Sequence, residues 1–132
     1  ENIIPVKPNT IAKSIAIGNP ADGYYGIKTA NASGGYGEDI SDEEIVSAMK
    51  LLAETEGVFT ETAGGVTVGV TQKLVQQGRI KPDEVTVICI TGNGLKTQEA
   101  LADCFSAPAV IEAKIDSFEE IFSNDLALNG LH

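Results

Sequence analysis

Residues 85–94 read VTVICITGNG, a nearly continuous run of β-branched residues that ends in two closely spaced glycines. Such a run is typical of a strand that is covered on both faces, because its side chains on both sides are then apolar. Ligands of open α/β sheets bind beyond the carboxyl ends of the strands, so the turn at residues 91–94 is the first candidate for a binding site. A turn from strand to helix also needs glycine for purely structural reasons, and this alternative stays open.

Helices are expected before and after this strand. Residues 41–44 (SDEE) form a capping box, and the apolar stripe that follows predicts a helix that Gly57 ends. A second helix is expected from Thr60 or Thr62 to Gly78, and its interior glycines imply close packing or a nearby ligand. The residues of the first stripe are Ile45, Met49, Leu52 and Ala53.

Helices that flank a buried strand make a parallel sheet the natural class. We therefore expect an α/β protein, a partial three-layer α/β/α unit with a mostly parallel open sheet, that forms one unit over residues 1–132. Cys89, within the apolar run, is expected to be a small core residue. The other expected elements are helices at 10–17, 22–33 and 97–105, a strand at 109–114 and a helical turn at 117–122.

Charge and composition exclude several classes of function. Nine basic and nineteen acidic residues give a net charge of −10, which works against binding to nucleic acid or to anionic lipid. No apolar run approaches the roughly 18 residues of a membrane span. The single histidine is His132, so we expect no histidine-based metal site and no Ser-His-Asp triad. Two cysteines without a secretory leader, Cys89 and Cys104, indicate a cytoplasmic compartment.

Two charged residues near the glycine clusters could also carry chemistry. The stretch 94–97 (GLKT) is similar to the end of a phosphate-binding loop, but a leucine separates its glycine from its lysine, so the pattern fails. Lys96 is therefore expected at the surface or at a helix start. Glu61 precedes a glycine-rich helix start, where donors can converge on an anion or on the edge of a cofactor; it could equally be an ordinary residue of the helix N-terminus.

Four short motifs occur together in a fixed order. They are residues 8–12 (PNTIA), 17–20 (IGNP), 54–57 (ETEG) followed by Glu61, and 90–96 (ITGNGLK). With these motifs the chain resembles, over nearly its whole length, the C-terminal third of threonine synthases, which are pyridoxal-phosphate enzymes of the tryptophan-synthase-β type. The resemblance implies an incomplete fold-type II enzyme unit.

The resemblance also implies an activity and a set of site residues. Threonine synthase is a carbon–oxygen lyase of threonine biosynthesis that converts O-phosphohomoserine and water to L-threonine and phosphate on pyridoxal 5'-phosphate. In the family, the threonine that matches Thr91 hydrogen-bonds the pyridine nitrogen of the cofactor. The implied cofactor-binding residues are Thr91, Gly92, Asn93 and Gly94. The possible cleft-lining residues are Thr10, Ala12 and Glu61.

The matched motifs do not include the catalytic lysine of the family. Its Schiff-base lysine, the asparagine beside the cofactor's phenolic oxygen and the glycine-rich phosphate loop precede the matched part, and these 132 residues contain none of the three motifs. Lys96 is no substitute, because the family has a lysine at this position in addition to the catalytic one. We therefore expect no catalytic residue in this chain and no activity of the chain alone. Because an incomplete sheet exposes apolar surface, we also expect a homodimer.

Two alternatives to this interpretation remain. The first is a stand-alone module that uses the Thr91 turn to bind a small anion or another subunit, without catalysis. The second keeps the enzyme class and changes the reaction, since threonine dehydratase and cysteine synthase share the fold. We rank the second alternative lower, because those enzymes usually have a serine-based motif in place of TGNGLK.

Overall fold

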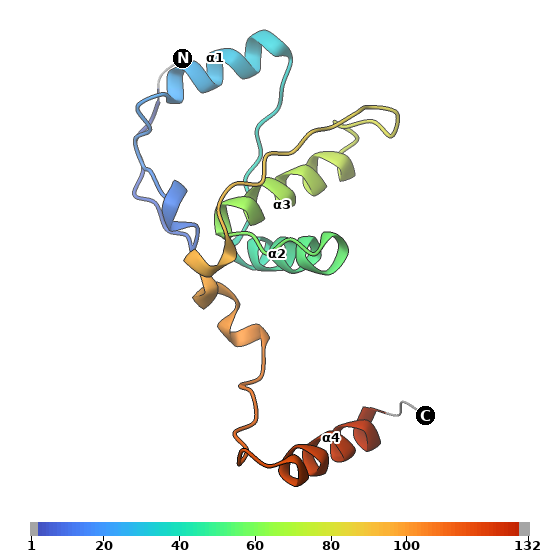
Figure 1. The fold of residues 1–132 in the computed structure, drawn as a ribbon. Coiled ribbons are helices and arrows are strands. Elements are labelled where there is room, and N and C mark those ends of the chain that lie inside the picture. Colours follow the sequence, from blue (N-terminus) through green and yellow to red (C-terminus); the bar gives the residue numbers. More distant parts are fainter. Residues whose placement is uncertain (1–2, 130–132) are drawn as a thin grey trace.

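Helices α2 (Asp42–Glu56) and α3 (Thr62–Gln76) lie side by side at the centre of the fold (Figure 1). The computed structural model describes residues 3–129, with side chains up to residue 123. Both helices agree with the prediction, and α2 begins at the expected capping box. Ser41 Oγ accepts a hydrogen bond from the backbone N–H of Glu44, and the Glu44 carboxylate accepts one from the backbone N–H of Ser41.

Gly65 lets α3 approach α2 closely. A β-carbon at this position would lie 2.7 Å from Met49 Cγ and 2.9 Å from the carbonyl oxygen of Ile45. The predicted need for close packing around the glycines of α3 is therefore confirmed at Gly65. The buried apolar residues are Ala12, Ile45, Ala48, Met49, Leu52, Val68 and Leu101, which include all of the predicted α2 stripe except the half-buried Ala53.

The N-terminal segment is held at the start of α2 by a polar contact. The hydroxyl of Thr10 and the backbone N–H of Ile11 both donate to Asp42 Oδ1, at 2.7 and 3.1 Å. The predicted helix at 10–17 is wrong, because only the short 3-10 turn η1 (Lys13–Ile15) forms there. The Thr10 hydroxyl is engaged with α2 and does not cap a helix of its own.

This contact makes stability depend on pH. Hydrogen bonds from the Thr10 hydroxyl and then from the Ile11 N–H lower the pKa of the Asp42 carboxyl below its ordinary value. Such a group stabilises the fold above its unfolded-state pKa, and the contribution is lost as the pH falls through its folded-state pKa. We expect the difference in thermal midpoint between the wild type and Asp42→Asn to shrink from about pH 6 to about pH 2. Thr10→Val should weaken this pH dependence, and equal acid sensitivity of the wild type and Asp42→Asn would contradict it.

Residues 85–90 form no regular element and pair with no strand in the described part of the chain. Val85 and Val87 are 96% and 83% exposed. The expected parallel sheet of a three-layer unit is therefore not formed by residues 3–129, whose one β-contact is an antiparallel bridge between Thr60 and Asn93. A strand needs neighbours for its hydrogen bonds and for both of its faces, and a local run of residues does not supply them. Cys89 is exposed, so the prediction of a core thiol is wrong.

Short 3-10 helices follow the turn at residues 91–94. They are η2 (Gly94–Lys96) and η3 (Gln98–Cys104), which replace the α-helix predicted at 97–105. The predicted strand at 109–114 is absent from the structure, where this segment has no regular element. Residues 3–129 supply no partner strand for this segment, and without a partner its backbone cannot form the hydrogen bonds of a sheet.

Two peripheral helices complete the described chain. Helix α1 (Gly23–Ser33) agrees with the predicted helix at 22–33. Helix α4 (Ile115–Asn129) includes the predicted turn at 117–122 and lies apart from α2 and α3, after an extended segment (Figure 1). Within residues 3–129, no helix is long and apolar enough to cross a membrane, and no group of acidic, cysteine or histidine side chains could hold a metal ion. His132 lies outside the described residues.

Candidate functional site

The segment that leads into α3 binds the glycine turn that follows residues 85–90. We call these two segments, residues 59–62 and 92–97, the α3 clamp. It contains the buried polar residues of the described chain, which are Thr60, Glu61, Thr62 and Thr97. Its hydrogen bonds run from Gly94 N to Phe59 O (3.1 Å), from Glu61 N and Thr60 Oγ1 to Gly92 O (3.4 and 3.5 Å), and from Thr62 N to Thr97 Oγ1 (3.1 Å).

Thr91 lies immediately before the clamp. Its side chain is exposed, and its hydroxyl has no hydrogen-bond partner among the described residues. On one side, Ile90 packs against the cluster of Ala48, Leu52 and Val68. On the other side, Gly92 adopts a left-handed φ of 76°. The structure thus leaves a free hydroxyl between an apolar anchor and a hydrogen-bonded turn.

Glu61 belongs to the same site as the turn. A β-carbon at Gly92 would overlap the Glu61 carboxylate, and Lys96 Nζ lies 3.8 Å from Glu61 Oε2. The Glu61 side chain is 10% exposed and the Lys96 side chain 64% exposed, so the predicted surface position of Lys96 is confirmed. Sequence reasoning named Glu61 and the turn separately, and the structure brings them into contact.

The other predicted site residues lie elsewhere. Ala12 is 1% exposed and packs in the core with Ile45, Met49 and Leu101. Thr10 is bound to Asp42 at the start of α2. Neither residue contacts the clamp through a hydrogen bond in the described chain. Their role in lining a cleft stays a prediction.

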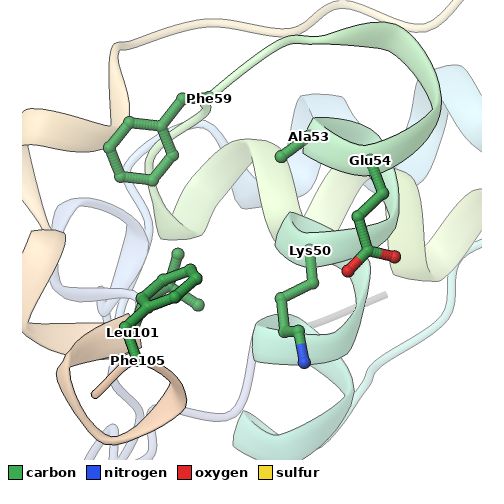
Figure 2. A pocket seen from close by; sticks show the side chains of 6 residues that line it. All are labelled: Lys50, Ala53, Glu54, Phe59, Leu101 and Phe105. Atoms are coloured by element: carbon green, nitrogen blue, oxygen red, sulfur yellow. The ribbon is translucent and has the colours of Figure 1, made fainter. Parts of the chain in front are cut away.

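A largely apolar pocket of about 400 Å³ lies beside the clamp (Figure 2). It is lined by Lys50, Ala53, Glu54, Phe59, Leu101 and Phe105. Phe59 connects the pocket to the turn, because its ring lies where a β-carbon of Gly94 would be. None of the predicted site residues lines this pocket.

Two hydroxyls of the clamp were not predicted as site residues. Thr97 is 7% exposed and accepts a hydrogen bond from a residue that lies 35 positions earlier. Thr62 is fully buried, and its Oγ1 has no hydrogen-bond partner in the described part of the chain. The sequence signal for Thr97 is its position directly after residues 94–96 (GLK). The local sequence gives no reason to expect a contact between this hydroxyl and α3.

Comparisons with known proteins agree with the sequence motifs. A family profile described as "Pyridoxal-phosphate dependent enzyme" matches residues 1–92. Threonine synthase of Methanocaldococcus jannaschii is 41% identical over 122 residues, which are 92% of this chain. Threonine synthase of Bacillus sp. is 47% identical over 90 residues, 68% of the chain, and that of Mycobacterium tuberculosis is 36% identical over 110 residues, 83% of the chain. These matches confirm the resemblance on which the sequence-based expectation rests.

The chain spans only part of these relatives. The aligned residues are 30% of the length of the Methanocaldococcus jannaschii protein, 26% of the Bacillus protein and 30% of the Mycobacterium tuberculosis protein. The alignments therefore cover less than a third of the length of each relative.

Proposed function

Since the chain belongs to the family of pyridoxal-phosphate dependent enzymes, we propose that it is the C-terminal part of a threonine synthase and that its Thr91 turn contacts the cofactor. The activity proposed for the whole enzyme is the conversion of O-phosphohomoserine and water to L-threonine and phosphate. The observation that carries the proposal is the Thr91 hydroxyl, which is exposed and unpaired in the described chain beside a turn that hydrogen bonds hold to the start of α3.

The chemistry of this turn suits the ring nitrogen of the cofactor. Pyridoxal phosphate supplies an electron sink for carbanion chemistry when it is bound. A hydroxyl can donate to or accept from a ring nitrogen, but unlike a carboxylate it adds no negative charge there. In this proposal Thr91 binds the nitrogen, and Gly92, Asn93 and Gly94 shape the turn beside the ring. Lys96 forms an ion pair with the nearby Glu61 carboxylate, whose oxygen lies 3.8 Å from the lysine nitrogen.

We place residues 85–90 in a parallel sheet that other parts of the enzyme complete. All of these side chains except Cys89 are β-branched, and all except Ile90 are exposed in the described chain, as expected for a strand whose neighbours are not in this segment. We also propose, from the sequence-based expectation, that the enzyme is a homodimer and that it is cytoplasmic. These 132 residues then provide the ring-nitrogen side of the site and are inactive alone.

Transfer into a related enzyme tests the function. The chain would replace the 122 aligned residues of the Methanocaldococcus jannaschii threonine synthase, and phosphate release from O-phosphohomoserine would be measured. We expect an active chimera. Thr91→Val should lower kcat/KM by about 5- to 150-fold, because the ring nitrogen, a buried polar group, would lose its partner at a cost of about 1–3 kcal/mol. Thr91→Ser keeps the hydroxyl and is the matched control.

Two outcomes would contradict the proposal. One is a Thr91→Val chimera as active as the wild-type chimera. The other is an isolated chain that, with equimolar pyridoxal phosphate, is fixed by borohydride at one of its own lysines. Calorimetric titration distinguishes the proposed enzyme fragment from the alternative, a stand-alone anion-binding module. Tight binding of phosphate or a nucleotide by the isolated chain would favour the module.

A further inference from the structure

Helix α3 has no side-chain cap of its own. Its N-cap residue, Glu61, has an extended backbone conformation, and its side chain makes no capping hydrogen bond. Instead, the first amide of the helix, Thr62 N–H, donates to Thr97 Oγ1 at 3.1 Å. Both residues are buried, at 0% and 7% exposure. A hydroxyl from the second segment of the α3 clamp, residues 92–97, therefore takes the place of an N-cap for a distant helix.

Thr97 also closes the 3-10 turn η2 that precedes it. Its backbone N–H donates to Gly94 O at 3.0 Å, so the same residue joins the end of η2 to the start of α3. At the other end of the clamp, the Gly92 carbonyl accepts hydrogen bonds from Glu61 N and Thr60 Oγ1. The turn is thus attached to α3 at both of its ends.

Thr91 depends on this attachment for its position. Residues 85–90, before it, have no strand partner in the described chain, and Ile90 anchors them near Thr91 through apolar packing. Apolar contact is non-directional, whereas the hydrogen bonds of the clamp fix a backbone direction. The clamp is therefore the part of the structure that sets the direction in which the Thr91 hydroxyl points.

We propose that Thr97 is a positioning residue for Thr91: its buried hydroxyl caps α3, holds the turn at residues 92–97 against the helix start, and thereby fixes the Thr91 hydroxyl. The inference rests on the cofactor role proposed for Thr91. Thr97 itself touches neither substrate nor cofactor in this scheme. The buried Thr97 oxygen, rather than the size of the side chain, is the essential feature.

Two variants separate the effect of the Thr97 hydroxyl oxygen from the effect of the side-chain shape. Thr97→Val keeps the shape and removes the acceptor, whereas Thr97→Ser keeps the acceptor. In the ¹⁵N-labelled 132-residue chain without cofactor, Thr97→Val should speed hydrogen exchange of the Thr62 and Gly94 amides about fivefold, the equivalent of one net hydrogen bond. ¹⁵N relaxation should also report a more mobile Thr91 amide in this variant.

Controls in the same spectra exclude a general loss of structure. Thr97→Ser should restore the exchange rates and the order of the Thr91 amide, and the amides in the centre of α2, such as that of Met49, should be unchanged in both variants. Unchanged exchange at Thr62 and Gly94 in Thr97→Val would overturn the proposal. Equal acceleration throughout α2 would also overturn it, because Thr97 would then act on global stability alone.

Addition of pyridoxal phosphate tests the link to the proposed function separately. If Thr91 contacts the cofactor ring in this chain, its resonances and those of Gly92 should shift, and about fivefold more cofactor should be needed in Thr97→Val. If the wild-type Thr91 resonances do not shift, the cofactor contact fails in the isolated chain. The positioning role is decided in that case by exchange and relaxation, which need no cofactor.

Discussion

Met49→Ala is expected to lower the free energy of unfolding by about 2–5 kcal/mol, since truncation of a fully buried large side chain leaves a cavity. Met49 is 0% exposed and packs with Ala12, Ile45 and Leu101, which join α2 to the N-terminal segment and to η3. Gly65 of α3 lies so close that a β-carbon there would be 2.7 Å from Met49 Cγ, and this backbone contact leaves the cavity little freedom to collapse. Urea unfolding followed by circular dichroism measures the change.

Leu51→Ala on the same helix is the matched control. Leu51 is 36% exposed, and we expect its truncation to cost clearly less than that of Met49. Equal losses at the two positions would mean that the α2–α3 contact is not the stabilising core of the chain.

Gly92→Ala is the second large effect, with an expected loss of about 2–5 kcal/mol. Two costs add at this position. A left-handed φ of 76° costs an L-residue about 1–2 kcal/mol, and the new methyl group overlaps the buried Glu61 carboxylate, for which overpacking costs about 1–3 kcal/mol. The variant should also lose protection from hydrogen exchange at Glu61, whose N–H donates to the Gly92 carbonyl.

Gly78→Ala separates these two costs. Gly78 has nearly the same φ, 69°, but a β-carbon there would meet nothing within 4 Å. We expect a loss of about 1–2 kcal/mol from the backbone conformation alone. Urea unfolding of both variants gives the comparison, and a loss at Gly78 as large as that at Gly92 would contradict a steric role of Glu61.

Local signals in the sequence were sufficient for α2 and α3. The capping box at residues 41–44 and the apolar stripe of α2 both arise within a few residues, where spacing determines which side chains share a face. Residues 85–90 carry an equally clear local signal, yet they form no strand in the described chain. Sheet formation depends on partners at a distance, so β-branched residues predict the extended conformation but not the pairing.

The candidate site divides in the same way. Glycine spacing and the Thr91 hydroxyl indicate the turn as a candidate site, and the position before a helix start indicates Glu61. No local sequence pattern relates Glu61 to the turn. The contact between Glu61 and Gly92 and the capping of Thr62 by Thr97 arise only when segments some thirty residues apart meet. The cofactor role of Thr91 stays a prediction.

The remote cap of α3 has a consequence for biosynthesis. Because the hydroxyl that closes the helix start belongs to a residue 35 positions later, a nascent polypeptide leaving the ribosome exposes this helix with a frayed first turn until Thr97 has emerged. Closure of so long a loop costs chain entropy before its contacts form. We therefore expect the turn beside Thr91 to be one of the last parts of this region to reach its native geometry.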